Sequence, residues 1–338
     1  MDRTTQFIGQ STPFLDALER ASRAAALNRP VLVIGERGTG KELVAERLHR
    51  LSPRWGGPLV TVNCAALPET LIEAELFGHE AGAFTGAARA RAGRFEEADG
   101  GTLFLDELAT LSAGAQERLL RAVEYGEVTR IGSNRAQQID VRIVAATNEH
   151  LPRLAQEGRF RPDLLDRLSF EVITLPPLRA RDGDVPVLAD YFGRRMASEL
   201  EWEGWPGFSA AALAALEQHD WPGNVRELRN VVERAVYRWD APESPVGAIA
   251  FDPFASPWMP GAAPRIEAVA VERALALPSE GFRAACLAHE KRLLEQALEE
   301  CRFNQRRAAQ RLALSYDQLR HALRRHGLLD RAAQSSIS

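Results

Sequence analysis

The chain has 338 residues, of which 45% are hydrophobic and 26% are charged, and its formal net charge is −4. This composition is typical of a water-soluble globular protein, and the length allows two or three domains of roughly 100–200 residues each. The first residues lack the apolar core of a secretory signal, and no apolar run approaches the ~18 residues of a membrane span. We therefore expect a cytoplasmic protein without membrane insertion. Three cysteines without metal spacing are expected to be buried or idle thiols in a reducing compartment: Cys64, Cys286 and Cys301.

Between residues 30 and 170, short apolar runs rich in β-branched residues alternate with stretches of helical periodicity. Four of these runs are predicted to be buried strands, and they read PVLVIGE, LVTVNC, GTLFLDE and VRIVAATN. Strands that alternate with helices favour a parallel sheet covered by helical layers. We therefore predict an α/β subdomain over residues 1–175.

The first predicted strand leads into a glycine-rich loop, GERGTGKE, and then into a helix. In this context the glycines allow backbone N–H groups to turn towards phosphate oxygens, and Lys41 supplies a charge for the β- and γ-phosphates. The predicted nucleotide-binding residues of this P-loop are Gly35, Glu36, Arg37, Gly38, Thr39, Gly40, Lys41 and Glu42. Glu42 stands where a serine or threonine usually binds Mg²⁺, which weakens a magnesium assignment at that position.

A tryptophan, Trp55, follows the P-loop helix and is flanked by proline and glycine residues, a pattern typical of a surface loop. An exposed tryptophan often anchors a protein partner. A half-buried tryptophan instead packs against its own fold. Both interpretations of Trp55 remain open at the level of the sequence.

The next unusual stretch is GAFTGA, which has the glycines and threonine of a second phosphate loop. No strand ends immediately before it and no lysine follows it, so a phosphate-binding role is not expected. Phe84 has no apolar periodicity around it that would bury its side chain. A phenylalanine in this setting is typical of a loop whose apolar tip is buried in another molecule.

The third predicted strand ends in an acidic pair, Asp106 and Glu107. Ligands of open parallel sheets bind at the carboxyl ends of the strands, so this pair is expected to lie near the P-loop. Asp106 is predicted to hold Mg²⁺, directly or through water, and Glu107 to orient or deprotonate the attacking water. The alternative, an acidic pair that only ends a strand, is disfavoured by the P-loop upstream.

Strand patterns stop after residue 175, and helical stretches follow. In the last of these stretches four apolar residues lie on one helical face, namely Leu228, Val231, Val232 and Ala235. We therefore predict a helical lid subdomain over residues 176–240.

Residues 241–280 begin with a proline-rich stretch that has no regular apolar period. Proline removes backbone donors and restricts φ, so this segment is predicted to be a linker. Its aromatic residues are candidates for docking on a neighbouring element instead, and they are Phe251, Phe254 and Trp258.

Residues 281–330 contain two short helical patterns separated by a tight turn, with Asn304 and Ser315 placed to cap the two helices. This arrangement predicts a helix-turn-helix. Residues 302–326 include seven arginines and one acid, so the segment suits the phosphate backbone of DNA although the whole chain is acidic. The predicted DNA contacts are Ser315, Gln318, Arg320, His321 and Arg324. A small helical bundle that binds protein is the alternative.

The helix before this segment carries an apolar stripe formed by Leu287, Leu294, Leu298 and Cys301. Such a stripe either packs on the helix-turn-helix or pairs two copies of the chain. The sequence leaves both possibilities open.

Five motifs together resemble those of the AAA+ transcription activators that work with sigma-54, namely GERGTGKE, ELFGHEAGAFTGA, GGTLFLDE, FRPDLLDRL and WPGNVREL. The resemblance covers nearly the whole chain, and other AAA+ groups lack GAFTGA. Glu42 is the family's usual residue at its position. The resemblance implies an α/β AAA+ P-loop NTPase with a parallel sheet and a helical lid. It also implies a C-terminal all-α helix-turn-helix domain of the Fis type.

The resemblance implies roles for residues inside one subunit. Asn63 resembles the switch residue that hydrogen-bonds Glu107 and releases it for hydrolysis. Thr147 and Asn148 resemble the first sensor, which lies beside the nucleotide, and Arg226 resembles the second sensor, which the lid carries.

Other implied roles involve a second molecule. Arg161 and Arg167 resemble the arginine fingers that reach the γ-phosphate of a neighbouring subunit, so a ring is expected, which is a hexamer in this family. The tip that contacts sigma-54 is implied to be Gly82, Ala83, Phe84, Thr85, Gly86 and Ala87.

The function implied by the resemblance is an ATPase that remodels the closed complexes of sigma-54 RNA polymerase into open complexes. The implied cofactors are ATP and Mg²⁺, and the implied partners are the sigma-54 holoenzyme and double-stranded enhancer DNA. Because the AAA+ motifs begin almost at the N-terminus, we expect no N-terminal regulatory domain and control in trans. The front of the chain resembles the phage-shock operon activators of this family, which a phage-shock A type repressor inhibits, and Trp55 is the candidate contact.

Two other functions are disfavoured by these motifs. A nucleotide-gated DNA-binding regulator would not use hydrolysis mechanically, and the acidic pair with two candidate finger arginines argues against it. A general AAA+ unfoldase or helicase loader would not need GAFTGA, which argues against that alternative.

Overall fold

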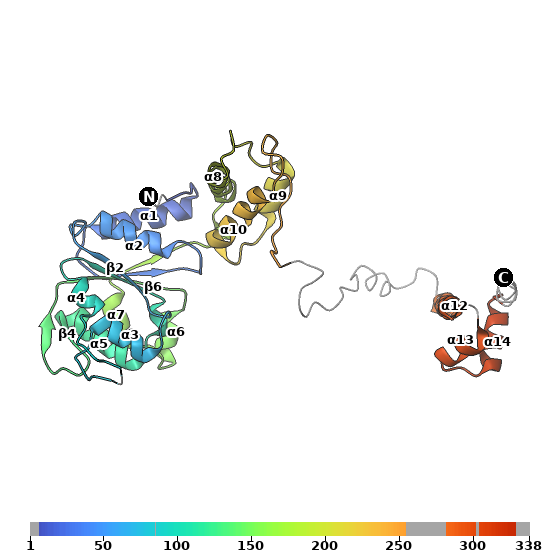
Figure 1. Ribbon diagram of the computed structural model, residues 1–338, viewed down its shortest axis with the longest axis horizontal. Helices are drawn as coiled ribbons and strands as arrows, with labels where there is room; N and C mark the ends of the chain where they lie inside the picture. Colours follow the sequence, from blue (N-terminus) through green and yellow to red (C-terminus); the bar gives the residue numbers. More distant parts are fainter. Residues whose placement is uncertain (1–6, 85, 255–281, 302–303, 329–338) are drawn as a thin grey trace. The chain divides into compact units, whose positions relative to one another are not determined.

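The computed structural model describes residues 7–84, 86–254, 282–301 and 304–328. These residues belong to two compact units that meet in the sequence between Pro253 and Phe254 (Figure 1). Of the residues singled out in the sequence, Thr85 and Trp258 lie outside the described residues. Within the described ranges, no helix has both the length and the apolarity to cross a membrane.

The larger unit is built around a five-stranded parallel sheet of strand order β2-β3-β6-β1-β7. Its strands are β1 (Val31–Ile34), β2 (Leu59–Asn63), β3 (Thr102–Asp106), β6 (Arg142–Thr147) and β7 (Glu171–Thr174). The four predicted strands are confirmed. The edge strand β7 was not predicted, because its four residues, EVIT, carry too little apolar pattern to stand out. A separate antiparallel hairpin pairs β4 (Glu127–Thr129) with β5 (Ala136–Gln138).

Helices cover both faces of the sheet (Figure 1). One face carries α1 (Thr12–Ala25) and α2 (Lys41–Arg50). The other face carries α3 (Glu69–Phe77), α4 (Arg94–Glu97), η1 (Leu108–Thr110), α5 (Ala113–Tyr125), α6 (Leu151–Gln156) and α7 (Pro162–Leu168). Successive strand side chains point to opposite faces, so a strand buried on both sides must be apolar throughout.

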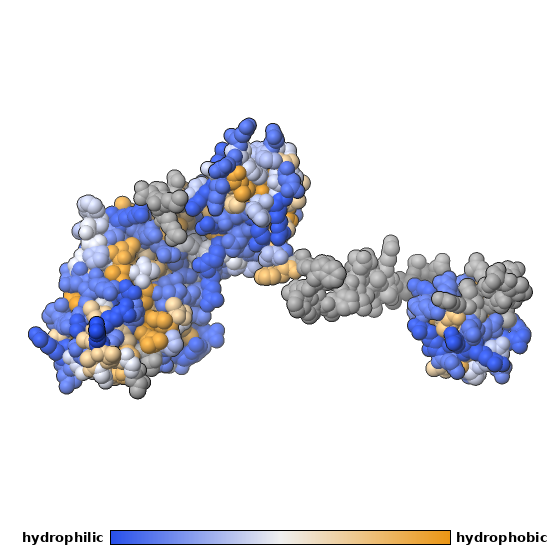
Figure 2. Space-filling model, viewed as in Figure 1, coloured by the Kyte–Doolittle hydropathy of each residue, from blue (hydrophilic) through white to orange (hydrophobic). Residues whose placement is uncertain are grey.

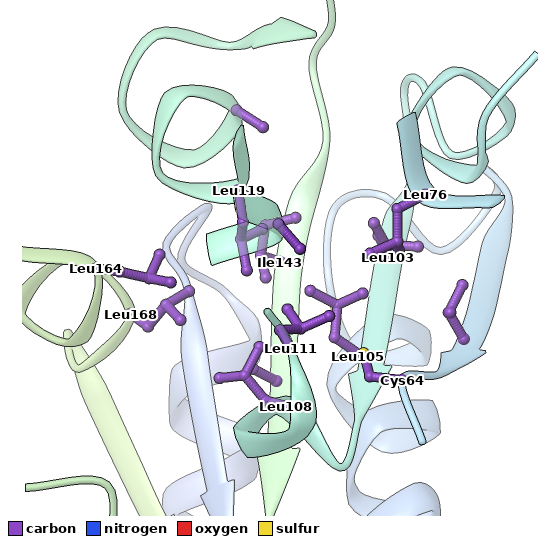
Figure 3. Close-up of a cluster of buried hydrophobic side chains, with 14 of the residues drawn as sticks. Cys64, Leu76, Leu103, Leu105, Leu108, Leu111, Leu119, Ile143, Leu164 and Leu168 are labelled. Atoms are coloured by element: carbon purple, nitrogen blue, oxygen red, sulfur yellow. The ribbon is translucent and has the colours of Figure 1, made fainter. Parts of the chain in front are cut away.

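The two faces have separate apolar cores. Val31 and Val33 of β1 belong to the core under α1 and α2, whereas Leu32 between them belongs to the opposite core. In that second core, leucines of η1, α5 and α7 pack on the strand residues Leu105 and Ile143 (Figure 3). The sheet is thus held rigidly between two layers, and its carboxyl edge presents fixed positions for the loops that follow the strands.

The rest of the larger unit is a helical lid. Its elements are η2 (Leu178–Ala180), α8 (Asp184–Glu199), α9 (Ala210–Gln218) and α10 (Asn224–Tyr237). The predicted inward face of α10 is confirmed, since its four apolar residues are buried. The fully buried Trp221 packs with this face and with α8.

The structure corrects the start of the predicted linker. Val246 is fully buried, and its backbone exchanges hydrogen bonds with Gly207 and Ser209 of the lid. Phe251 stacks on the His219 ring with the centroids 4.4 Å apart. Residues 241–253 therefore pack on the lid, because a chain without regular periodicity can still bury single apolar side chains in an existing surface.

The smaller unit contains α12 (Phe282–Glu300), α13 (Gln305–Arg311) and α14 (Tyr316–Arg325). Leu294 and Leu298 of α12 are buried against α13 and α14, with Cys301 partly buried beside them. Leu287 is 42% exposed, so only the C-terminal part of the predicted stripe packs on the helix-turn-helix. Cys286 is exposed as well, so of the two expected states, buried or idle, burial does not apply to that thiol.

Candidate functional site

The loop between β1 and α2 has the backbone of a phosphate cradle. Gly38 and Gly40 have φ values of 79° and 97°, which residues with a Cβ rarely adopt. A Cβ on Gly38 would lie 2.2 Å from the carbonyl oxygen of Gly223, so the close approach of the lid also requires glycine there. The loop ends at the N-terminus of α2, whose free N–H groups and dipole favour a bound phosphate.

Lys41 is the first residue of α2 and is only 8% exposed. Its Nζ donates to the carbonyl oxygens of Gly35 at 3.0 Å and of Glu36 at 3.4 Å. Burial lowers the pKa of Lys41, while the negative charges of Asp106 and Glu107 oppose this shift. The amine is thus positioned inside the loop, near the acidic pair.

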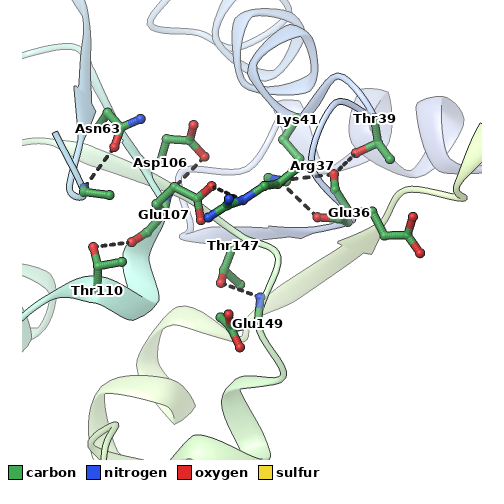
Figure 4. Close-up of polar contacts among 12 residues, drawn as sticks. Glu36, Arg37, Thr39, Lys41, Asn63, Asp106, Glu107, Thr110, Thr147 and Glu149 are labelled. Atoms are coloured by element: carbon green, nitrogen blue, oxygen red, sulfur yellow. Dashed lines mark hydrogen bonds and ion pairs between the residues drawn. The ribbon is translucent and has the colours of Figure 1, made fainter. Parts of the chain in front are cut away.

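The sheet topology explains why these groups meet. Strand β6 lies between β1 and β3, so the three carboxyl ends place Lys41, Thr147 and Asp106 around one point (Figure 4). The Oδ1 atom of Asp106 accepts the N–H of Glu107 at 3.0 Å. The Lys41 amine is suited to bind phosphate oxygens, and the carboxylates of Asp106 and Glu107 opposite it are suited to a cation that accompanies the phosphates.

Glu107 has a left-handed backbone, with φ 52° and ψ 43°, which is uncommon for a residue other than glycine. Its side chain is only 16% exposed, and its Oε1 lies 3.6 Å from Nε of Arg37 in the P-loop. Strained backbone of this kind concentrates at functional sites. The strain therefore marks Glu107 as a candidate for the residue that handles the attacking water.

Asn63 ends β2 directly opposite Asp106 in the register of the sheet. Its Oδ1 accepts the backbone N–H of Ala65 at 2.9 Å. Among the described residues, the expected hydrogen bond from Asn63 to Glu107 is not formed, and the Oδ1 atom instead accepts a bond within the turn that follows its own strand. Asn63 nevertheless lies beside the acidic pair.

The first-sensor candidates follow β6. Thr147 is fully buried, and its Oγ1 accepts the N–H of Glu149 at 3.0 Å. Asn148 is half-buried and comes directly after the strand. Cys64, next to the acidic pair, is buried, and burial together with the charges of Asp106 and Glu107 raises its pKa to about 12. That thiol is therefore not a nucleophile at neutral pH.

The lid contacts the P-loop through residues that the sequence analysis missed. Asn224, buried at the start of α10, donates to the Glu36 carboxylate at 3.1 Å and to the Arg37 carbonyl at 3.0 Å. Arg179 donates to the same carboxylate at 2.9 Å. The hydrogen bonds from Arg179 and Asn224 lower the pKa of Glu36 to about 2. In the sequence, Asn224 stands out only because it follows a glycine at the start of an amphipathic helix. Nothing in the sequence indicates that its side chain contacts Glu36 and Arg37.

A cavity of about 350 Å³ lies between the P-loop and the lid. Its polar end is formed by Gly38 to Glu42 together with Asp106. Its other end is lined by apolar side chains of the N-terminal segment and the lid, including Phe7, Ile8, Leu188, Tyr191 and Val225. The predicted Arg226 also lines it, as do Arg195 and Arg229, which were not predicted. A polar end beside an apolar end suits a nucleotide, with the phosphates on the loop and the base among the apolar side chains.

The two candidate finger arginines lie away from this cavity. Arg161 immediately precedes α7 and forms an ion pair with Asp163 at 2.7 Å, and Arg167 in α7 pairs with Glu124 of α5. Both side chains are exposed, and neither lines the nucleotide cavity of its own chain.

The GAFTGA stretch lies in a loop between α3 and α4. The loop is narrow at its base, where a Cβ on Gly78 would lie 2.7 Å from the nitrogen of Gly93. Near the tip, the N–H of Gly82 donates to the carbonyl oxygen of Ala87 at 2.8 Å. Phe84 is 37% exposed, and its ring lies 5.0 Å from that of His79. Phe84 thus also contacts its own chain, because the folded tip brings it back onto the start of the loop.

The structure distinguishes between the two interpretations of Trp55. This side chain is 72% exposed, so it is not a packing residue of its own fold. It borders a second cavity of about 570 Å³ that is also lined by Arg54 and Arg142.

The smaller unit has the geometry of a helix-turn-helix. Asn304 caps α13 and Ser315 caps α14, as predicted, and the turn contains Ala313 with a φ of 53°. The Ser315 and Gln318 side chains form a reciprocal capping box, so both already have local partners. The predicted DNA contacts are all exposed, namely Ser315, Gln318, Arg320, His321 and Arg324. The visible face of this unit is mostly hydrophilic (Figure 2).

Three protein families match consecutive parts of the chain. The Sigma-54 interaction domain matches residues 7–174, and the AAA+ ATPase lid domain matches residues 179–245. The Fis family of bacterial regulatory proteins matches residues 288–326. Together these matches cover both units.

Similar proteins are found along nearly the whole chain. The Psp operon transcriptional activator of Escherichia coli is 50% identical over 321 residues, which cover 94% of this chain and 97% of that protein. The transcriptional regulatory protein ZraR of Salmonella typhimurium is 52% identical over 229 residues, or 68% of this chain and 52% of that protein. The crystal structure of NtrX from Brucella abortus in complex with ATP has a TM-score of 0.69 and 32% identity, and the match covers 95% of this chain and 70% of that one.

Proposed function

The chain belongs to the sigma-54-dependent AAA+ transcriptional activators with a Fis-type DNA-binding domain, and from this premise we propose that it uses ATP hydrolysis to convert closed complexes of sigma-54 RNA polymerase into open complexes. The observation that carries the proposal is the P-loop of the Sigma-54 interaction domain, with buried Lys41 facing Asp106 and Glu107. The similar protein NtrX has been crystallised in complex with ATP, which supports nucleotide binding by this chain.

In the proposed reaction the chain binds the triphosphate of ATP along residues 38–42 and places its base at the apolar end of the cavity. Lys41 neutralises the β- and γ-phosphates. Glu107 orients the attacking water and accepts its proton, for which a carboxylate fixed near the phosphate site is suited. Thr147, Asn148 and Arg226 are proposed to report whether the γ-phosphate is present.

We propose that Mg²⁺ accompanies the nucleotide and is held on the protein side by Asp106. Mg²⁺ typically takes one or two carboxylates and fills its other positions with phosphate and water oxygens, which Asp106 beside the P-loop fits. When bound, the cation would neutralise charge on the phosphates.

Each active site is proposed to be completed by Arg161 and Arg167 of a neighbouring subunit in a ring, expected to be a hexamer. Support comes from the exposure of both side chains and from their absence from the lining of the cavity in their own chain. A positive charge supplied in trans makes hydrolysis depend on assembly.

Hydrolysis is proposed to move the loop that carries Phe84 and Thr85 against sigma-54. Asn63 beside Asp106 begins the connection, and α3 leads from it to the base of the loop. Gly82 and Gly86, with φ values of 80° and 106°, give the tip backbone freedom. Phe84 would leave His79 and become buried in the partner.

The smaller unit is proposed to hold the activator on enhancer DNA through Arg320, His321 and Arg324, in the cytoplasm where the polymerase acts. Control in trans by a phage-shock A type repressor is proposed from the similarity to the Psp operon activator, with the exposed Trp55 as its anchor.

The proposal is tested by following open-complex formation on a supercoiled promoter with purified polymerase, enhancer DNA and ATP. Opening is expected with the sigma-54 holoenzyme and not with the sigma-70 holoenzyme. Phe84→Ala is expected to hydrolyse ATP at the wild-type rate and to fail in opening, whereas Tyr237→Ala, an exposed aromatic side chain on the lid, should behave as wild type. Opening with sigma-70 alone, or full opening by Phe84→Ala, would contradict the proposal.

A further inference from the structure

The junction between the N-terminal segment and the lid contains a buried ion pair that the proposed chemistry does not use. Arg181 and Asp184 are 3% and 0% exposed, and Nε of Arg181 donates to Oδ2 of Asp184 at 2.7 Å. Buried ion pairs are costly to form, so this one is expected to hold an arrangement that apolar side chains would not specify.

The Asp184 carboxylate connects the N-terminus of α8 to the N-terminus of α1 through hydrogen bonds. It is the first residue of α8, and its Oδ1 also accepts the backbone N–H groups of Gln10 at 2.6 Å and Ser11 at 2.9 Å. Ser11 is the N-cap of α1, whose first turn has no acidic residue of its own. One carboxylate of the lid therefore supplies the negative charge that both helix N-termini favour.

Arg181 holds the adjoining residues of the N-terminal segment. Its Nη2 donates to the carbonyl oxygen of Ile8 at 3.1 Å, and its guanidinium lies 3.7 Å from the centre of the Phe14 ring. Between these contacts, a Cβ on Gly9 would lie 2.6 Å from Nη2 of Arg181 and 2.7 Å from Oδ2 of Asp184. The segment is thus packed directly onto the ion pair with no space for a side chain.

The residues held in this way form part of the nucleotide cavity. Phe7, Ile8 and Phe14 line it, together with Arg181 itself and the apolar residues of α8. The wall at the base-binding end therefore includes chain from the N-terminus that the lid fixes. The phosphate end, by contrast, belongs to the α/β subdomain.

We propose that Arg181 and Asp184 are positioning residues for nucleobase recognition: they hold residues 7–9 against α8 as one wall of the base-binding end of the cavity. This inference rests on the proposed ATPase function. It assigns the pair to the affinity and base selectivity of the site and not to the chemical step, whose groups lie on β3 and the P-loop.

The test measures kcat and KM of the full-length chain with ATP and with GTP. Arg181→Met keeps an unbranched aliphatic stem but removes the guanidinium, with its charge and its hydrogen bonds. It is expected to raise KM for ATP about tenfold, as for the loss of one charge-assisted hydrogen bond, with kcat within about twofold of wild type. The preference for ATP over GTP is expected to fall. Arg181→Lys, which keeps the charge next to Asp184, should restore part of the affinity and the preference.

The matched control is Arg194→Met, because Arg194 lies on α8, the helix that Asp184 begins, and forms an exposed ion pair with Asp190. It should leave both constants unchanged. If Arg181→Met does not fold, Ser11→Ala removes only the hydroxyl hydrogen bond to Asp184 and should raise KM about two- to threefold.

The inference is overturned if a folded Arg181→Met keeps the wild-type KM and preference, or if it lowers kcat alone. Equilibrium binding of ATP and GTP to the same variants separates this result from a failure of the proposed function. Absence of ATP turnover in the wild type would contradict the proposed ATPase function. A preference for binding ATP over GTP that is present in the wild type and lost in Arg181→Met would still support the role of the pair in positioning.

Discussion

Glu36 connects the phosphate loop to the lid, since its carboxylate accepts hydrogen bonds from Arg179 and Asn224. Gly38, two residues later, touches the lid directly, because no Cβ fits between it and Gly223. At the scale of single residues, then, the loop that binds phosphate is also a contact surface for the lid. If nucleotide binding moves the loop, these contacts are expected to shift the start of α10 as well.

The hydrogen bonds to Glu36 predict a pH dependence of stability. Its pKa is about 2 in the folded chain, below the ordinary value of 4.5. A depressed pKa means that the stabilisation is complete above about pH 4.5 and is lost as the pH falls towards 2. Thermal unfolding of wild type and Glu36→Gln should differ most at pH 7, and the difference should shrink between pH 5 and pH 3.

Arg50→Gln is a suitable control, because Arg50 forms an exposed ion pair with Glu46 far from the lid contacts. If the difference in thermal stability between wild type and Glu36→Gln stays constant or widens as the pH falls, the hydrogen bonds from Arg179 and Asn224 to Glu36 do not stabilise the lid.

At the scale of elements, α7 and the residue before it present two arginines to the outside. Their partners in the single chain are Asp163 and Glu124, so each guanidinium is oriented by a carboxylate before any assembly. The arginines would exchange these partners for phosphate oxygens when a second subunit docks. In the proposed ring, this element would supply preoriented positive charge and the neighbouring subunit would supply the nucleotide.

Arg161→Ala is expected to reduce ATP turnover by roughly 10³-fold or more, the scale of a lost arginine finger, while ATP binding survives. Binding persists because Arg161 does not line the cavity of its own chain. Steady-state hydrolysis and equilibrium ATP binding measure the two quantities. Arg153→Ala, which removes an exposed arginine paired with Glu157 on α6, should leave both unchanged. Wild-type turnover by Arg161→Ala would defeat the finger assignment.

At the scale of the whole molecule, two units with separate apolar cores divide the proposed work. The sheet and lid form the ATPase, and α12 to α14 bury their own leucines and alanines. Because neither core depends on residues of the other unit, each activity is expected to survive loss of the other.

A chain truncated after residue 279 should therefore keep ATP hydrolysis and lose specific DNA binding. Lys41→Ala should do the reverse, since it removes the P-loop amine and leaves the smaller unit intact. Footprinting and ATP turnover on the same two proteins provide the measurements. Protection of enhancer DNA by the truncated chain would place the DNA contacts elsewhere.

Local chemistry let the sequence predict much of this protein. Apolar β-branched runs predicted four strands, and capping residues predicted the starts of α13 and α14. Glycines before Lys41, directly after a strand, predicted a loop whose φ values only glycine adopts easily. Each of these inferences uses residues within about ten positions of one another, where backbone sterics and hydrogen bonding dominate.

Other features were decided only by the tertiary structure. Asn63 pairs with Ala65 and not with Glu107, and Phe84 packs on His79. The base end of the cavity combines residues 7–8 with side chains near positions 188 and 225. The spacing of residues along the sequence does not indicate contacts between segments that are this distant in the chain. Such contacts depend on how the sheet, the lid and the N-terminal segment pack together. The sequence by itself determined the phosphate site and the family motifs, whereas packing determined what encloses the nucleotide and which side chains hold the lid in place.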